Sequence, residues 1–311
     1  MNRQTPVPEA GVHQILRENP MPLVMIVLFK WRLLKPALSF IGTVLRRFFF
    51  DQFMYRLKPG RVPVKNIEHP LDAWIPVRYE MAGVYLGFIQ LWIFALAYLR
   101  KRIGREFDDD LVDFLAGLRR CYADAAGIYG PCLSTTRRPA RAPCLRLAFV
   151  YAVDPHLFCV PSLHVLVVGY TYQCLRDLLA ARGLAGRFTV ELEALRNQAI
   201  AITESILYVR QHSVNCIPAA LSMLQVIVPS YDASEAKAFL SVLFGNEPGL
   251  SEYRRSEILA YMDSLYDTLA SGGTGQGERY GAIVNFLEGY QSMEFDQAPE
   301  LRGSVEHGAE A

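Results

Sequence analysis

Two histidines in this chain lie where an ionisable side chain is costly unless it meets water, a partner or a substrate. His164 follows Pro161 and Ser162 at the start of an apolar run, in the stretch FCVPSLHVLVVG. His212 lies seven residues after Ser205, in the stretch ESILYVRQHSVNC. A lone histidine of this kind is most simply a core residue with a hydrogen-bond partner. A functional interpretation therefore depends on whether further chemistry-bearing residues accompany the pair.

A basic segment at residues 134–143, STTRRPARAP, supplies the cations that such histidines need in order to act on an anion. Guanidinium groups make planar, two-pronged contacts with phosphate, so Arg137 and Arg138 are candidate phosphate ligands. Ser162 precedes a predicted helix, where its hydroxyl and nearby N–H groups can hold a phosphate oxygen. One imidazole can attack phosphorus while the other donates a proton. These residue types favour phosphoryl transfer, which in this form needs no metal or other cofactor.

The intervening segments must bring these motifs together. We predict a helix over 160–174, a polar connection over 176–197, and two short helices within 199–229 that break near His212. If the flanking segments cross a bilayer, the polar connection is cytoplasmic and both histidines return to the opposite surface. The basic loop reaches that surface too if residues 107–127 cross outward.

Residues 82–99, AGVYLGFIQLWIFALAYL, are the clearest candidate for a membrane span. Eighteen residues without a charge are long enough to cross the hydrocarbon layer, with a buried core helix as the alternative. Residues 21–50 are also apolar, but five basic residues interrupt them, which is typical of helices lying on the lipid surface. The basic residues that assign the end of the span to the cytoplasm are Arg100, Lys101, Arg102 and Arg105.

Composition fits a membrane-associated chain. Of the 311 residues 51% are hydrophobic, which is high for a soluble domain, while the 20% that are charged exceed the share expected in a dense membrane bundle. Residues 1–230 carry a net charge of +10 and residues 231–311 a net charge of −9. A basic, apolar body with an acidic tail favours anionic lipid over nucleic acid as the partner.

We therefore predict an all-α integral membrane helical bundle in three parts. Residues 1–79 form an N-terminal region with interfacial helices, residues 80–230 the membrane core, and residues 231–311 an acidic helical cytoplasmic tail. We expect the helices of this tail over about 233–244, 252–270 and 279–293. The predicted location is the inner membrane of the cell, crossed several times, with the candidate site facing outward.

At its histidine motifs the sequence resembles the type 2 phosphatidic acid phosphatase (PAP2) superfamily of membrane lipid phosphatases and phosphotransferases. That family carries K-x6-RP, PSxH and SR-x5-H-x3-D motifs. PSLH at 161–164 matches the second motif, and residues 204–216 match the third in the placement of Ser205 and His212. TRRP at 136–139 is a partial match to the first, and the resemblance covers about residues 80–230.

The resemblance implies a PAP2-like helical core that acts on a phosphorylated lipid without a metal or cofactor. His212 would be the nucleophile that forms a phosphohistidine, and His164 the general acid. Arg138 and Ser162 would bind phosphate, and Arg137 and Ser205 complete the candidate substrate-binding set.

Three positions depart from the family pattern. Pro131 replaces the motif lysine, Ile206 the arginine after the serine, and Cys216 the aspartate that orients the nucleophilic imidazole. Loss of such an orienting group in other histidine sites costs orders of magnitude in rate. Candidate replacements for the aspartate are Asn215, Glu204 and Asp154, and for the missing cations Arg137, Arg141 and Arg210.

Three alternatives stay open. The first is a catalytically degenerate PAP2-like protein that binds lipid phosphate or acts as a scaffold, as the three departures suggest. The second is a zinc site, because Cys159 with His164 and His212 with Cys216 supply two thiols and two imidazoles. The third is a soluble helical protein without a site.

Overall fold

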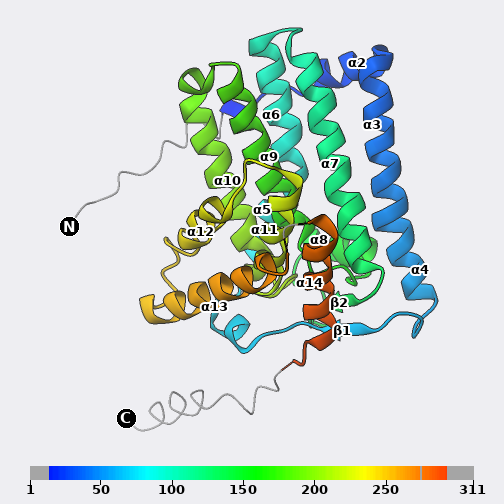
Figure 1. The fold of residues 1–311 in the computed structure, drawn as a ribbon, viewed down its shortest axis with the longest axis vertical. Coiled ribbons are helices and arrows are strands. Elements are labelled where there is room, and N and C mark those ends of the chain that lie inside the picture. Colours follow the sequence, from blue (N-terminus) through cyan, green and yellow to red (C-terminus); the bar gives the residue numbers. More distant parts are fainter. Residues whose placement is uncertain (1–13, 274, 293–311) are drawn as a thin grey trace.

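The computed structural model describes residues 14–273 and 275–292, and helices make up most of it, as predicted (Figure 1). In Figure 1, α3, α6, α7, α9 and α10 run side by side along the vertical axis and form the main bundle. Their bounds are α3 Trp31–Thr43, α6 Phe88–Ile103, α7 Phe107–Tyr129, α9 Leu163–Ala181 and α10 Thr189–Tyr208.

Shorter elements complete the bundle. α3 continues through a π-helical stretch, η1, into α4 without a break. This continuous helical segment, residues 31–57, is called the rod below, and it packs along α7. The remaining helices are α2 Met21–Phe29, η1 Val44–Phe50, α4 Asp51–Leu57, α5 Ala82–Leu86, α8 Leu145–Val153, α11 Cys216–Ile227, α12 Ala233–Ser241, α13 Glu252–Ala270 and α14 Gln276–Gly289, with 3-10 turns η2 Pro70–Trp74, η3 Tyr79–Met81 and η4 Ala185–Phe188.

A two-stranded parallel sheet was not predicted. β1 Val64–Asn66 pairs with β2 Leu133–Thr135, with Val64 opposite Leu133, and Ser134 makes a further bridge to Phe158. Each strand has three residues, too few for an alternating apolar pattern to stand out in the sequence. The sheet matters because it joins the segment between α4 and α5 to the segment after α7 and, through the bridge to Phe158, to the loop that leads into α9.

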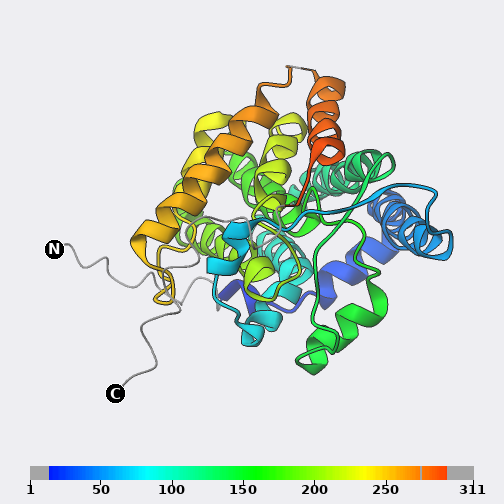
Figure 2. The ribbon, with the colours of Figure 1, turned by 90° about the horizontal axis from the view of Figure 1, so that it is seen from below.

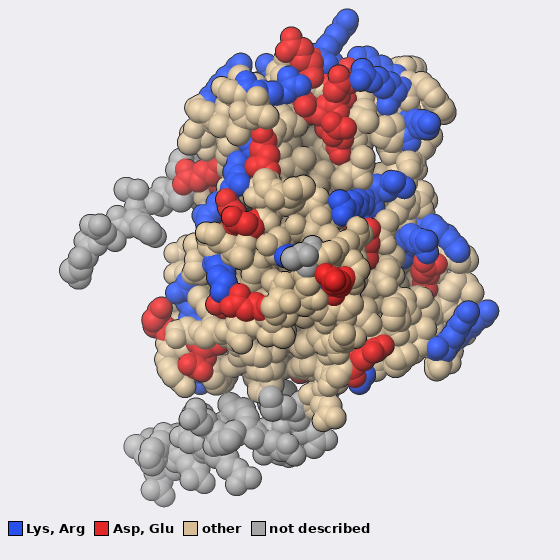
Figure 3. Space-filling view, viewed as in Figure 1, with Lys and Arg blue, Asp and Glu red and all other residues tan. Residues whose placement is uncertain are grey.

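Charges at one end of the bundle stabilise the α6–α7 hairpin. The predicted basic cluster closes α6, and α7 begins with three aspartates, each arrangement favouring its helix through the helix dipole. Asp108 accepts hydrogen bonds from Arg100 at 2.5 Å and from Lys30 at 2.6 Å. Figure 3 shows charged side chains gathering at this upper end, with wide areas free of charge below.

The candidate span is not one straight helix, because Gly87 separates α5 from α6. Within the described ranges no single helix combines the length and apolarity needed to cross a membrane. The segments Tyr79–Leu86 and Phe88–Ile103 meet the criteria only as a pair, with a bend of 40° between them.

The C-terminal helices belong to the same packed body. α11 is almost wholly buried and packs against α7, α9, α13 and α14. Seen from below in Figure 2, α13 and α14 lie on the side of the molecule away from α8. The predicted helices over 233–244, 252–270 and 279–293 correspond to α12, α13 and α14, and the part of the acidic region that they form contacts the core.

Candidate functional site

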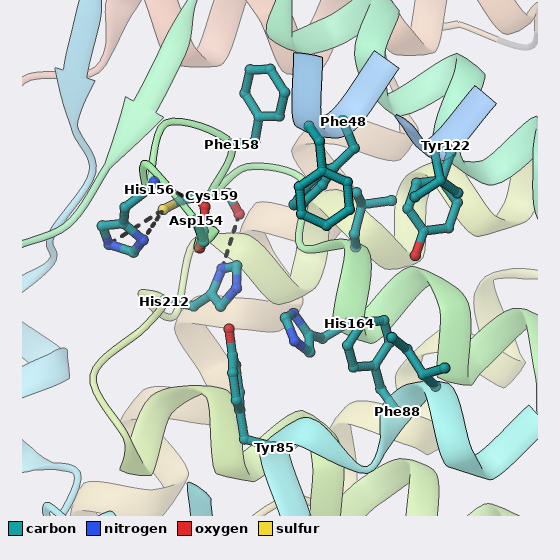
Figure 4. A pocket seen from close by; sticks show the side chains of 14 residues that line it. Phe48, Tyr85, Phe88, Tyr122, Asp154, His156, Phe158, Cys159, His164 and His212 are labelled. Atoms are coloured by element: carbon teal, nitrogen blue, oxygen red, sulfur yellow. Dashed lines mark hydrogen bonds between the residues drawn. The ribbon is translucent and has the colours of Figure 1, made fainter. Parts of the chain in front are cut away.

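A cavity of about 90 Å³ lies where the two histidine motifs meet. Its polar lining comes from the loop before α9, the first turn of α9, the loop before α11 and α5. These polar residues are Tyr85, Asp154, His156, Cys159, His164 and His212 (Figure 4). The rest of the lining is apolar or aromatic and includes Val44, Phe48 and Phe49 of η1, Phe88 and Ile89 of α6, and Tyr122 of α7. Since one water occupies about 30 Å³, the cavity has room for a group of roughly phosphate size.

The local sequence fixes His164 at the start of α9. Ser162 is the N-cap residue, and its side chain accepts a hydrogen bond from the Val165 N–H. The Tyr129 hydroxyl donates a hydrogen bond of 2.6 Å to the Pro161 carbonyl and ties the entry of α9 to α7. These contacts leave the imidazole partly buried and facing the cavity, as Figure 4 shows.

His212 lies in the break between α10 and α11, as predicted. Its Nδ1 is 3.1 Å from the Cys159 carbonyl oxygen. A carbonyl only accepts hydrogen bonds, so the neutral imidazole carries its proton on Nδ1 and has a free lone pair on Nε2. Burial lowers the pKa of His212 to about 3, although the bond to Cys159 acts in the opposite direction. The ring is therefore neutral at physiological pH.

The two imidazoles lie next to each other in the lining of the cavity. Their ring centroids are 5.6 Å apart and the rings are nearly perpendicular, at 71°. The Tyr85 ring stacks on His164 at 4.3 Å, and Phe88 packs against it at 4.2 Å (Figure 4). The aromatic pair sets the orientation of His164 and limits the approach of water. The geometry thus brings both predicted catalytic residues to one cavity.

Arg138 reaches the rim of this cavity through an ion pair. Its guanidinium donates to an Asp154 carboxylate oxygen at 2.8 Å and to the Asp154 backbone carbonyl at 3.0 Å, and it stacks on Tyr151. Asp154 lines the cavity, whereas no arginine or lysine among the described residues does. The nearest cation is therefore held by a carboxylate and does not face an open phosphate position.

His156 is a second feature of the same rim. It is buried and adopts a left-handed backbone conformation with φ of 64°. Its Nε2 lies 2.7 Å from the Thr136 hydroxyl, and its ring contacts the Cys159 sulfur. Burial, with smaller contributions from Arg138 and His212, holds its pKa well below the usual value. A neutral imidazole here supports the loop that carries Asp154 and Cys159.

The other candidate residues do not line the cavity. Ser162 is buried as a helix cap, and the Ser205 hydroxyl donates to the Ile202 carbonyl at 2.7 Å. Arg137 is 78% exposed and pairs with Glu68. Arg141 is exposed, and Arg210 is directed to the backbone of Asp72 and Ile75.

None of the three candidate replacements for the motif aspartate orients His212. Asn215 donates to the Ile67 carbonyl and accepts from Tyr261, while Glu204 accepts from the Phe244 N–H. Asp154 accepts from Arg138 and from the His156 N–H. The Cys159 carbonyl takes the orienting position instead. Sequence alone gives no signal for it, because any residue offers such a carbonyl.

Over the described ranges, no group of three or more histidine, cysteine, aspartate or glutamate side chains has a geometry that could hold a metal ion. The residues of the zinc alternative thus do not make such a group. The Cys216 sulfur accepts a hydrogen bond from the Ser213 N–H.

Sequence reasoning missed the aromatic lining. Tyr85 and Phe88 lie inside the predicted span, where nothing separates a site residue from a packing residue. Phe48, in the run of three phenylalanines at 48–50, and Tyr122, in a mixed helical stretch, carry no mark of a site either. No protein-family model, curated protein or solved structure matches this chain.

Proposed function

We propose that this chain is a metal-independent lipid phosphate phosphatase or phosphotransferase that works through a phosphohistidine at His212. The observation that carries the proposal is the pair of adjacent imidazoles that line one cavity of about 90 Å³. In that pair, His212 is held with its proton on Nδ1 and a lone pair on Nε2. This is the form of histidine that can attack phosphorus.

The proposed reaction has two balanced steps. His212 Nε2 attacks phosphorus, the bond from phosphorus to the lipid oxygen breaks, and His164 gives its proton to the departing oxygen. A bound phosphate anion near His164 favours the imidazolium that this step needs. Water or a second alcohol then attacks the phosphohistidine, His164 takes its proton, and the phosphorus–nitrogen bond breaks to restore both imidazoles.

A lipid is the favoured substrate because the surroundings of the cavity are apolar. Val44, Phe49 and Ile89 line it, and Ile89 is 45% exposed at the surface. Exposed apolar side chains continue outward on the rod and on α8, where Leu45 is 58% exposed and Leu145 is 90% exposed. Membrane contact over these surfaces, multi-pass insertion and an outward-facing site belong to this proposal.

A second candidate function is favoured by one observation. Arg138, which the resemblance implies would bind phosphate, is paired with Asp154. The carboxylate of Asp154 lines the cavity, and the guanidinium of Arg138 does not. This arrangement suits a degenerate PAP2-like protein that binds lipid phosphate weakly or acts as a scaffold.

The test is phosphate release by detergent-purified protein with a chelator present. Substrates are phosphatidate and a polyprenyl diphosphate, and the variants are His212→Ala and His164→Ala, with Asp124→Asn as the control outside the cavity. We expect turnover that both histidine substitutions reduce by at least about 100-fold and that the control retains. Absence of turnover on both lipids, with retained binding of phosphatidate, would favour the degenerate candidate.

A further inference from the structure

The loop that carries His212 has no helix or strand of its own, yet it is closely packed. Val209, Gln211, Ser213, Val214 and Asn215 are fully buried. Such a loop holds one conformation only if its polar groups find fixed partners. Those partners come from a segment that precedes the PAP2-like region, residues 64–75.

Asp72 is the central partner. Its buried carboxylate accepts a 2.8 Å hydrogen bond from the Val214 N–H, two residues after His212. The other carboxylate oxygen accepts from the His69 N–H at 2.8 Å and closes the start of η2. One side chain therefore joins the His212 loop to the 3-10 turn.

Two further contacts hold the ends of the loop. Arg210, in a left-handed conformation with φ of 57°, donates to the Asp72 carbonyl and, at 2.8 Å, to the Ile75 carbonyl. Asn215 donates to the Ile67 carbonyl at 2.8 Å and accepts from the Tyr261 hydroxyl at 2.5 Å. Tyr261 also stacks on His69 at 4.0 Å, so α13 contacts both the segment 64–75 and the loop that carries His212.

The same segment supports the acceptor of the His212 hydrogen bond. β1 pairs with β2, and the hydroxyl of Ser134 in β2 accepts from the Cys159 and Val160 N–H groups. Residues 64–75 therefore contact the His212 side of the bond between His212 Nδ1 and the Cys159 carbonyl directly, and they support the Cys159 side through β2. A shift of this segment would move donor and acceptor relative to each other.

We propose that Asp72 is a positioning residue for His212. Asp72 fixes the loop so that the His212 imidazole keeps its hydrogen bond to the Cys159 carbonyl, and Tyr261 of the C-terminal region secures the same loop through Asn215. This inference rests on the proposed function for its catalytic consequence. It gives the acidic region a role at the site. The hydrogen bond from the Val214 N–H to Asp72, together with the Cys159 carbonyl, takes over the orienting task of the missing motif aspartate.

The test uses the full purified chain and the variants Asp72→Asn and Tyr261→Phe. Asp124→Asn is the matched control, because Asp124 is a partly buried carboxylate that accepts from Tyr280, Arg120 and Gln276 away from the cavity. The readouts are kcat and KM for phosphatidate hydrolysis and the imidazole Nδ1–H signal of His212 in ¹⁵N-histidine-labelled protein. His212→Gln identifies that signal.

We expect Asp72→Asn to lower kcat by roughly 10- to 100-fold, the range found when hydrogen-bond partners of metal-binding side chains are removed, with KM changed less than about twofold. The Nδ1–H signal broadens or disappears in this variant and stays sharp in Asp124→Asn. Tyr261→Phe produces a smaller change in the same direction, and it decides the question if Asp72→Asn does not fold.

A sharp, unshifted signal and a kcat close to that of Asp124→Asn in the folded variants would overturn the positioning role. If the unmodified protein hydrolyses no lipid phosphate, the proposed function fails. The Nδ1–H signal then still decides whether Asp72 and Tyr261 hold the imidazole.

Discussion

The ion pair between Asp154 and Arg138 gives the sharpest quantitative prediction. Asp154→Asn removes one negative charge from the cavity wall and leaves a side chain of the same shape with one oxygen to accept from Arg138. The guanidinium is then free to share its remaining donors with a phosphate. We expect the variant to bind phosphate more tightly than the unmodified protein.

The size of the effect follows from the cavity. Asp154 lines a space of about 90 Å³ together with both histidines. We take a bound phosphate to lie roughly 6 Å from the carboxylate. At that separation and an effective dielectric constant of about 20, one unit of like charge costs about 2.8 kcal/mol. Asp154 is 20% exposed, so solvent reduces this figure, and we expect a gain in affinity of about 10- to 100-fold.

The assay is calorimetric titration of inorganic phosphate and of a short-chain phosphatidate into Asp154→Asn and the unmodified protein. Asp124→Asn, which also removes a partly buried carboxylate, controls for the general change in net charge. Equal or weaker phosphate binding by Asp154→Asn than by this control would refute the reasoning that the ion pair blocks a phosphate position.

Three further predictions concern stability and membrane contact. The pKa of His212 is about 3 in the folded chain, against 6.5 for an ordinary histidine, so the unfolded chain binds the proton more readily and stability falls as pH decreases from about 6.5 toward 3. The loss in the free energy of unfolding approaches 1.4 kcal/mol per pH unit. Urea unfolding between pH 7 and 4 should show that this free energy falls less steeply with decreasing pH in His212→Gln than in the unmodified protein, and an equal dependence on pH contradicts the burial argument. Cys216→Asp should lower stability by about 3 kcal/mol relative to Cys216→Ser, because it buries an unpaired charge, and should not raise activity; faster turnover would show that the motif aspartate still has a place here. Leu45→Glu and Leu145→Glu should weaken flotation with anionic vesicles several-fold, whereas Val190→Glu, on an exposed part of α10, should not; equal losses would argue against a membrane face on the rod and α8.

Much of the helix pattern could be predicted because its signals are local. The break near His212, the helix entered through Pro161 and Ser162, and the three C-terminal helices each correspond to an observed element. Apolar spacing and helix-start residues mark such elements without knowledge of their neighbours. The break at Gly87 was not predicted, since a glycine within an apolar run also fits a continuous helix.

The site could be predicted only in part. His164 and His212 do meet, but whether Ser162 caps a helix or contacts a ligand depends on side-chain direction, which sequence does not give. The pairing of Arg138 with Asp154 joins residues 16 positions apart, one before α8 and one directly after it. The clamp from Asp72 to Val214 spans 142 positions and uses a backbone N–H, so no residue type announces it.

The most direct test of the account is detection of a phosphohistidine at His212. Purified protein is incubated with ³²P-labelled phosphatidate and quenched in alkali, and the labelled peptide is identified by mass spectrometry. The account predicts a label that is stable in alkali, labile in acid, confined to the peptide that contains His212, and absent from His212→Gln. Lipid turnover without that label, or a label that persists in His212→Gln, would contradict it.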